Sequence, residues 1–267
     1  MFNPLRSVEI NTYRFVHPRV ADPQRGFRIA QISDVHLGRW VKPRHMEQVV
    51  EYVNENEPQL VALTGDYVGY NDSDLEPCIK TLGELAPRTF AVLGNHDHWT
   101  CPDTATDAFE QAGIPVLANR SVILDDFAAP IEVVGVDDHV TDNADIDSAF
   151  ETVGGSNFCL ALNHVPSIAP DLADEGADLI LSGHTHGHQF NIPKFTNWLA
   201  KRLGVEYHVG PYYIDGSYLY INRGLGSASW PWRIGAAPEL TFFELAPGDH
   251  PRLELLRTEE LAVEHRP

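Results

Sequence analysis

The chain has 267 residues, and its 43% hydrophobic and 10% aromatic content is enough for one sizeable core, so we expect a single domain over residues 1–267. The net charge of −19 would repel a polyanion at long range, which argues against nucleic acid as a partner. Cys78, Cys101 and Cys159 are odd in number and form no CxxC pair, which argues against a disulfide framework or a thiolate zinc site.

The sequence gives no indication of a membrane span or a signal peptide. No run of about 18 apolar residues occurs. Residues 1–20 are polar and mixed, without the apolar core of a signal peptide. We therefore expect a cytoplasmic protein.

Predicted strands alternate with predicted helices in the first part of the chain. Within 45–57, for example, Met46, Val49, Val50 and Val53 share one helical face. In chain order the elements are strand 27–33, helix 45–57, strand 59–65, helix 74–86, strand 89–94 and helix 103–113.

From residue 114 onward the pattern becomes richer in strands. The elements are short strands over 114–126 and 129–138, a helix around 145–153, strand 158–164, a further helical stretch, strand 178–184, and alternating segments over 205–222 and 238–257. This order predicts two packed sheets with helices on their outer faces.

Five of the predicted strands end in residues that can bind metal ions, often through a glycine that allows a tight turn. They are Asp34-Val35-His36, Gly65-Asp66, Gly94-Asn95-His96-Asp97, His164, and His184-Thr185-His186. Ligands bind beyond the carboxyl ends of strands in open α/β sheets, so all five ends can converge on one crevice. The stretch ILSGHTHGHQ (180–189) alone is equally consistent with a polar turn, but five such ends in order are not coincidence.

The collected donors are two carboxylates, one amide oxygen and four imidazoles, which suit Mn, Fe, Zn or Co. Seven donors are too many for one ion and fit two ions if one carboxylate bridges them. Such a centre is locally positive in an acidic protein and would attract phosphate.

The five blocks D-x-H, G-D, G-N-H-D, His and G-H-T-H occur in this order between residues 34 and 186. Together they resemble the signature of the calcineurin-like metallophosphoesterase superfamily, with core motifs over 27–190. The resemblance implies an α/β (α+β) fold, a four-layer αββα sandwich of two mixed β-sheets flanked by helices. It also implies two divalent metal ions as cofactors, manganese first, with iron, zinc or cobalt as alternatives.

The resemblance assigns the seven donors to two ions that share one carboxylate. The first ion would be held by Asp34, His36 and His186, the second by Asn95, His164 and His184, and Asp66 would bridge.

The implied reaction is a two-metal, in-line displacement in which a metal-bridging hydroxide attacks phosphorus. His96 would bind no metal. It would act as a catalytic residue that faces the substrate and protonates the leaving oxygen, and Asp97 would fix its orientation.

Within the superfamily the chain is similar to short bacterial phosphodiesterases of the YaeI/YkuE type, through GHTHGHQ, NRGLG (222–226) and PWR (231–233). This similarity implies hydrolysis of a phosphodiester or pyrophosphate bond in a small or lipid-linked nucleotide such as UDP-2,3-diacylglucosamine. A nuclease or phosphomonoesterase of the same superfamily, and a non-catalytic binding module, are the alternatives. The sequence does not indicate the oligomeric state.

Residues 190–235 are rich in aromatic side chains, which favours either ordinary core and hairpin packing or a cap beside the substrate. The side chains are Phe190, Phe195, Trp198, Leu199, Leu203, Tyr207, Tyr212, Tyr213, Trp230 and Trp232, interleaved with Lys194, Lys201 and Arg202. The stretch WLAKRLG (198–204) resembles an amphipathic helix, which would give peripheral contact with the inner membrane.

Three further residues are candidates for substrate binding. Arg223 and Arg233 are candidate phosphate clamps, because a guanidinium binds phosphate through two hydrogen bonds, although surface ion pairs are an equal alternative. His188 lies outside the G-H-T-H block and is either substrate-facing or a plain polar residue.

Overall fold

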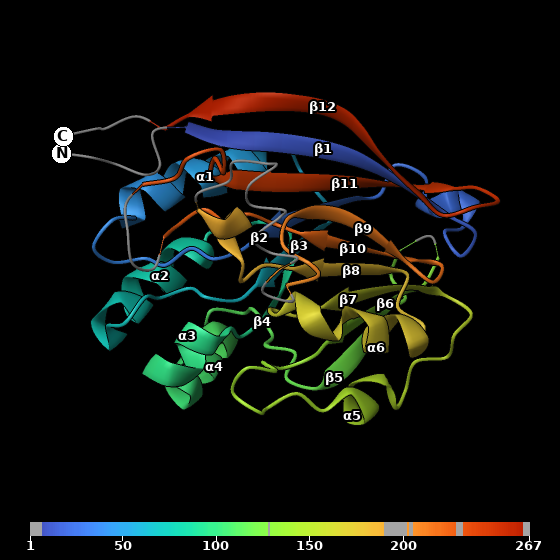
Figure 1. Cartoon of the computed structure of the whole chain (residues 1–267), viewed down its shortest axis with the longest axis horizontal. Helices are drawn as coiled ribbons and strands as arrows, with labels where there is room; N and C mark the ends of the chain where they lie inside the picture. The colour runs from blue at the N-terminus through green and yellow to red at the C-terminus, as the bar shows by residue number, and fades with distance from the viewer. Residues whose placement is uncertain (1–6, 128, 190–201, 203–204, 228–231, 264–267) are drawn as a thin grey trace.

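Two six-stranded mixed sheets pack face to face in this computed structural model, with helices on their outer sides (Figure 1). The structure describes residues 7–127, 129–189, 202, 205–227 and 232–263. The predicted four-layer α/β sandwich is confirmed.

The first sheet combines three parallel strands with three strands from the two ends of the chain. Strands β2, β3 and β4 are parallel neighbours, β11 is antiparallel to β2, and β1 is parallel to β11. The strand order is β12 (Arg252–Ala262), β1 (Ser7–His17), β11 (Glu239–Pro247), β2 (Arg28–Ile32), β3 (Leu60–Thr64) and β4 (Arg88–Val92).

The second sheet has a parallel centre with an antiparallel strand at each edge. Strands β6, β7, β8 and β10 run parallel, whereas β5 and β9 are antiparallel to their neighbours. The strand order is β5 (Arg120–Leu124), β6 (Ile131–Gly135), β7 (Phe158–Leu162), β8 (Leu179–Ser182), β10 (Ser217–Ile221) and β9 (Gly210–Ile214).

Three apolar clusters hold the four layers together. The first lies between the first sheet and the helices α1 (Pro43–Glu55), α2 (Leu75–Leu82) and α4 (Pro102–Gln111). A second fills the space between the sheets, and a third lies between the second sheet and α5 (Ile146–Phe150) and α6 (Ala169–Asp174). The short helices are α3 (Asn95–Thr100), η1 (Asp22–Gln24), η2 (Asp72–Asp74), η3 (Pro166–Ile168) and η4 (His186–His188).

Two elements were not predicted from the sequence. Strand β1 lies in the polar, mixed N-terminal region, yet Phe15 and Val8 are fully buried because β1 runs between β11 and β12. Helix α3 begins within the G-N-H-D block, where only the end of a strand was expected.

Eight of the thirteen side chains named for the proposed cap lie outside the described residues. They are Phe190, Lys194, Phe195, Trp198, Leu199, Lys201, Leu203 and Trp230, and WLAKRLG apart from Arg202 lies outside as well. The cap and its membrane contact therefore stay predictions. Of the helices in the described part of the chain, none has the length and apolar character that a membrane span needs.

Candidate metal centre

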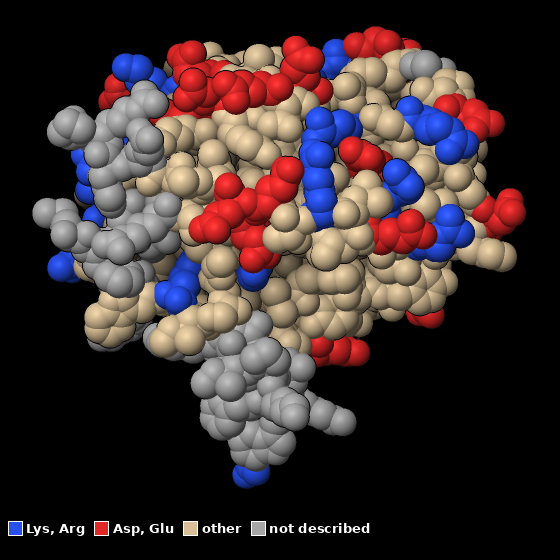
Figure 2. Space-filling view, turned by 90° about the horizontal axis from the view of Figure 1, so that it is seen from above, with Lys and Arg blue, Asp and Glu red and all other residues tan. Residues whose placement is uncertain are grey.

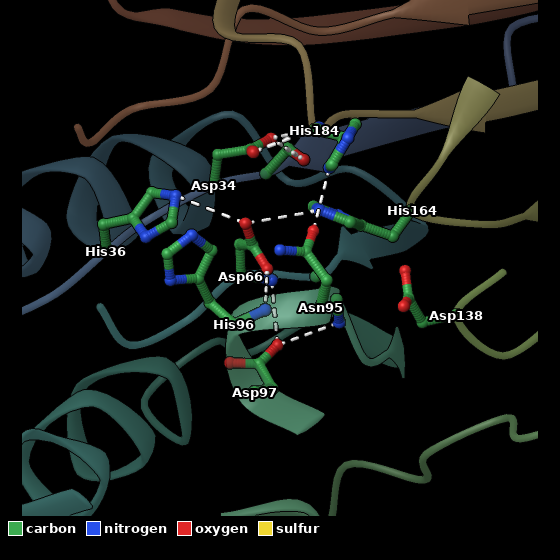
Figure 3. Close-up of polar contacts among 12 residues, drawn as sticks. Asp34, His36, Asp66, Asn95, His96, Asp97, Asp138, His164 and His184 are labelled. Carbon is green, nitrogen blue, oxygen red and sulfur yellow. Dashed lines mark hydrogen bonds and ion pairs between the residues drawn. The ribbon is translucent and has the colours of Figure 1, made fainter. Parts of the chain in front are cut away.

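The five strand ends singled out in the sequence meet at one edge of the sandwich. Strands β2, β3 and β4 bring their carboxyl ends to this edge from the first sheet, and β7 and β8 do so from the second. Figure 3 shows the side chains pointing toward one another around Asp66. Gly183 is needed for this approach, since a Cβ there would collide with the Asp34 carboxylate.

The first predicted set of metal donors is tightly clustered. The Nε2 atoms of His36 and His186 are 3.0 Å apart, and His186 Nε2 lies 3.3 Å from Oδ1 of Asp34. His36 Nε2 lies 3.4 Å from Oδ2 of Asp66. One donor atom from each of these four buried residues lies within 4.8 Å of the other three.

The second predicted set lies on the other side of Asp66. Nε2 of His164 is 3.3 Å from the same Asp66 oxygen that His36 approaches. Nδ1 of His184 is 2.8 Å from the side-chain oxygen of Asn95. Asp66 Oδ2 therefore lies between the two sets, which is the position that a bridging ligand needs.

These spacings fit divalent metal ions. Donor atoms that share one ion at about 2.1 Å and a right angle lie roughly 3.0 Å apart. The two facing nitrogens of His36 and His186 repel each other unless a proton or a cation lies between them. Nε2 of His164 is buried and has no hydrogen-bond partner in the structure. A metal ion would satisfy each of these atoms.

The donors differ in how readily they lose protons. Burial lowers the pKa values of His36 and His184 to about 4, so both rings are neutral at pH 7. Burial also lowers the pKa of His164, but the Asp66 carboxylate more than offsets it, and the pKa rises to about 10. Nδ1 of His164 lies 2.8 Å from the Thr64 carbonyl, which favours a proton on Nδ1, so loss of the Nε2 proton would free that nitrogen to bind a metal ion.

Five of the seven predicted metal ligands have backbone φ angles in the left-handed region, which is uncommon for residues other than glycine. The angles are 47° for Asp34, 42° for His36, 57° for Asp66, 69° for His184 and 52° for His186. Such conformations persist only where surrounding contacts impose them. One of these contacts is the Asp34 carboxylate, which accepts a hydrogen bond from the His184 backbone N–H.

His96 lies beside the metal donors, but the structure corrects how it is oriented. Its Nδ1 lies 2.8 Å from the Gly69 carbonyl, and its ring packs at 4.8 Å from that of His36. Asp97 does not contact the His96 ring. Its carboxylate instead accepts backbone hydrogen bonds from Asp66 at 2.8 Å and Gly94 at 3.0 Å. Asp97 thus positions the loop that carries Asp66, and Gly69 orients His96.

The three candidate substrate contacts differ from one another. Arg223 is bound to two carboxylates, with Nε 2.9 Å from Glu239 and Nη2 2.5 Å from Glu9, so its guanidinium is not available as the predicted phosphate clamp. Arg233 lies against the metal donors, with Nη2 3.2 Å from Nδ1 of His186. Nε2 of His188 is buried and makes no hydrogen bond with any residue that the structure describes, and its ring stacks on that of His208.

One buried carboxylate at this edge, Asp138, was not among the candidate residues identified from the sequence. Asp138 follows β6 and is fully buried, and its Oδ1 has no hydrogen-bond partner in the structure. Figure 3 draws it in the same close-up as the metal donors. The signal was the segment GVDD, which repeats the pattern of an apolar strand, a glycine and an acidic residue. A sixth strand end therefore brings a carboxylate to the same edge.

The four-layer fold places metal donors from both sheets at the carboxyl ends of the strands. This arrangement is typical of metal-dependent hydrolases. A family model for calcineurin-like phosphoesterases matches residues 27–188. The chain belongs to this family, as its sequence motifs predicted, and it is a metal-dependent phosphoester hydrolase.

Relatives support the assignment along most of the chain. The metallophosphoesterase YkuE of Bacillus subtilis is 32% identical over 227 residues, covering 82% of this chain and 79% of the relative. The phosphodiesterase YaeI of Escherichia coli is 29% identical over 255 residues, covering 91% and 92%.

Solved structures show the same fold at low sequence identity. A dimetal phosphatase from Danio rerio superposes with a TM-score of 0.55 at 10% identity, covering 90% of this chain and all of that one (100%). The protein TT1561 of Thermus thermophilus gives a TM-score of 0.51 at 12% identity, covering 74% and 91%.

Proposed function

We propose that the protein hydrolyses a phosphodiester or pyrophosphate bond in a small or lipid-linked nucleotide, with UDP-2,3-diacylglucosamine as the reference substrate. The observation that carries the proposal is the position of Asp66, whose Oδ2 lies 3.4 Å from His36 and 3.3 Å from His164. A carboxylate shared by two donor sets is what a pair of ions needs to bind the two sides of one phosphoryl group.

Two divalent ions held by these residues would supply Lewis-acid stabilisation of the phosphoryl oxygens and activation of water. The donors are nitrogen and oxygen atoms without thiolate, which suits manganese, with iron, zinc and cobalt as alternatives. The buried carboxylates of Asp34 and Asp66 provide the negative charge that balances the ions.

The protein's own side chains supply proton transfer and orientation. A proton on Nδ1 of His96 is directed at the Gly69 carbonyl, so Nε2 is left to exchange a proton with the leaving oxygen. Arg233 places a guanidinium beside His186, where it adds positive charge at the edge of the donor cluster. The similarity to YaeI, which is named a phosphodiesterase, supports a diester substrate over a monoester.

The surface charge makes a polynucleotide substrate a weaker candidate. Figure 2 shows acidic side chains in clusters, with Lys and Arg scattered among them rather than forming a continuous basic strip on that face. Together with the net charge of −19, this distribution supports a small substrate over a long polyanion.

Phosphorus NMR of the Mn²⁺-loaded protein with UDP-2,3-diacylglucosamine tests the proposal. We expect UMP to form with the metal and not after chelation. Parallel samples contain a generic aryl phosphodiester, an aryl phosphomonoester and a supercoiled plasmid. If only the aryl phosphodiester is hydrolysed, the phosphodiesterase activity is supported and the lipid-linked nucleotide is rejected as the substrate. Faster cleavage of the monoester or the plasmid contradicts the proposal in favour of a phosphatase or a nuclease.

A further inference from the structure

A cavity of about 540 Å³ lies directly beside the metal centre, on the side of His36. We call it the side cavity. Besides His36, its wall includes the loop residues Arg39, Trp40 and Lys42 and, across from them, Tyr70 and Asp74. Its volume is within the range of pockets that bind small molecules, roughly 300–1,000 Å³.

The side cavity shares its wall with the machinery for proton transfer. Gly69 lines the cavity, and its carbonyl is the group that orients the His96 ring at 2.8 Å. The next residue, Tyr70, packs its ring 4.7 Å from that of His96. A group bound in the side cavity would therefore be joined to a phosphoryl group at the metal centre by a short connection.

Two aromatic rings give the side cavity surfaces for a planar group. The Tyr70 side chain is 68% exposed, an unusual state for a tyrosine beside a buried centre. Trp40 lies in the wall next to His36, and the Arg39 guanidinium carbon is 4.7 Å from the centre of its ring. Aromatic side chains of this kind stack on nucleic-acid bases with little dependence on sequence.

Three charged side chains of the side cavity, Arg39, Lys42 and Asp74, form no ion pair with another residue in the described part of the chain. The Asp74 carboxylate makes no hydrogen bond or ion pair with any described residue, although it lies so close to Gly38 that a Cβ there would be 2.7 Å from Oδ2. Arg39 and Lys42 form no ion pair with a described carboxylate, and Lys42 Nζ donates only to the Gly38 carbonyl, at 2.6 Å. Two such cations side by side are unexpected in a chain of charge −19.

We propose that the side cavity binds the nucleoside part of a nucleotide ester while the phosphoryl group lies at the metal centre; this inference rests on the proposed function. Trp40 and Tyr70 stack on the base, and the Asp74 carboxylate accepts hydrogen bonds from the ribose hydroxyls, as acidic residues do in other nucleotide sites. Arg39 and Lys42 face the negative charge of the phosphates. A lipid tail is excluded from this cavity, because charged groups line it and a hydrocarbon chain would leave them without water.

Two phosphodiesters that release the same p-nitrophenolate test the proposal. One carries uridine on the other oxygen of phosphorus, joined through O5′, and the second carries a methyl group. We expect the metal-loaded protein to favour the uridine ester at least tenfold in kcat/KM. The Trp40→Ala variant should reduce this preference roughly 5–150-fold, because stacking contributes that much per base. The Leu255→Ala variant removes an exposed large side chain of β12, outside the cavity wall, and should leave the preference unchanged.

The ribose contact has its own comparison. Asp74→Ala should abolish the preference for uridine over a 2′,3′-dideoxyuridine ester, whereas Asp72→Ala, an exposed neighbour outside the cavity wall, should keep it. Equal kcat/KM for the uridine and methyl esters in the unmodified protein overturns the nucleoside site and leaves the phosphodiesterase standing.

Failure to hydrolyse either ester rejects the proposed phosphodiesterase activity instead, and calorimetric titration with UMP then tests the nucleoside site separately. UMP binding that Trp40→Ala weakens supports the nucleoside site, and absence of UMP binding overturns it.

Discussion

The two sheets make different contributions to the metal centre. The strand ends of the first sheet supply both carboxylates and the amide, from Asp34, Asp66 and Asn95, with His36 as their one imidazole. The predicted donors of the second sheet are all imidazoles, from His164, His184 and His186; its carboxylate at this edge, Asp138, is not among the predicted donors. The first sheet thus provides the negative charge that attracts a cation, and the second provides neutral donors that favour transition metals over calcium or magnesium.

Each proposed ion takes donors from both sheets, so the ions would also tie the sheets together. Hydrogen bonds already cross this gap, from Gln31 to the Ser182 carbonyl at 3.0 Å and between His164 and Thr64 at 2.8 Å. Contacts other than the proposed ions therefore also align the two sheets at this edge.

The residue with the largest predicted effect on turnover belongs to neither donor set. We expect His96→Ala to lower kcat by roughly 10²–10⁴-fold while both ions are retained, because His96 is proposed to transfer a proton and not to bind metal. Steady-state kinetics with metal analysis of the same sample checks this. Loss of an ion together with activity would show that His96 is a ligand.

Replacing the Asp66 carboxylate tests whether both ions depend on this one negative charge for binding. We expect Asp66→Asn to weaken binding of both ions by roughly 10²–10⁴-fold, because a buried charge partner is worth about 3–5 kcal/mol. Asn95→Ala is the matched comparison and should lose only the second ion. Mass spectrometry of metals after gel filtration distinguishes the two variants. Full occupancy in Asp66→Asn contradicts a bridging role.

The pH dependence of metal binding should report on the protonation of His164, one of the imidazoles of the second sheet. His164 has a pKa of about 10 in the metal-free protein, so it carries a proton at pH 7 that a metal ion must displace. Affinity for the second ion should then rise about tenfold per pH unit below pH 10. Calorimetry in two buffers of different ionisation enthalpy should detect about one proton released. If no proton were released, His164 would not carry a proton that the metal ion displaces, and the expected pH dependence would be wrong.

A smaller effect, on the stability of the fold, is expected from an ion pair that contains none of the predicted metal ligands. His98 of α3 pairs with Asp137, which follows β6, at 2.7 Å. Burial lowers the pKa of His98, but the Asp137 hydrogen bond outweighs it and the pKa is raised above 6.5. The pair should stabilise the fold below pH 6.5 and lose this contribution as the pH rises through the raised pKa.

His98→Gln should therefore cost roughly 1 kcal/mol in the free energy of unfolding at pH 6 and less at pH 9. Urea unfolding of the metal-free protein at both pH values checks this sign. An equal cost at both pH values would show that the charge on His98 contributes nothing.

The metal donors were predictable because each one follows an apolar strand, and parallel strands bring their carboxyl ends to one edge. The residues that position the donors and His96 were not predictable from the sequence. Asp97 acts on backbone N–H groups across the centre, and Gly69 acts through a carbonyl that any residue would carry. The side cavity was also missed, since Trp40 lies between the predicted elements and Asp74 at the start of the predicted helix 74–86, and only tertiary packing brings the two together.

Strand β1 illustrates the same limit for the fold. Its sequence alternates incompletely, and its burial depends on β11 and β12, which lie more than 220 residues further along the chain. Local patterns therefore identified the strands next to the metal centre better than the strand that completes the first sheet.

The left-handed backbone of the metal ligands has a consequence for the side chains that these positions can carry. A side chain held at φ near +50° costs about 1–3 kcal/mol, and glycine removes most of that cost. Glycine at His36 or His186 would relieve that strain but would remove an imidazole donor, so catalysis would be lost. At these positions a relaxed backbone and a complete set of metal donors are therefore incompatible.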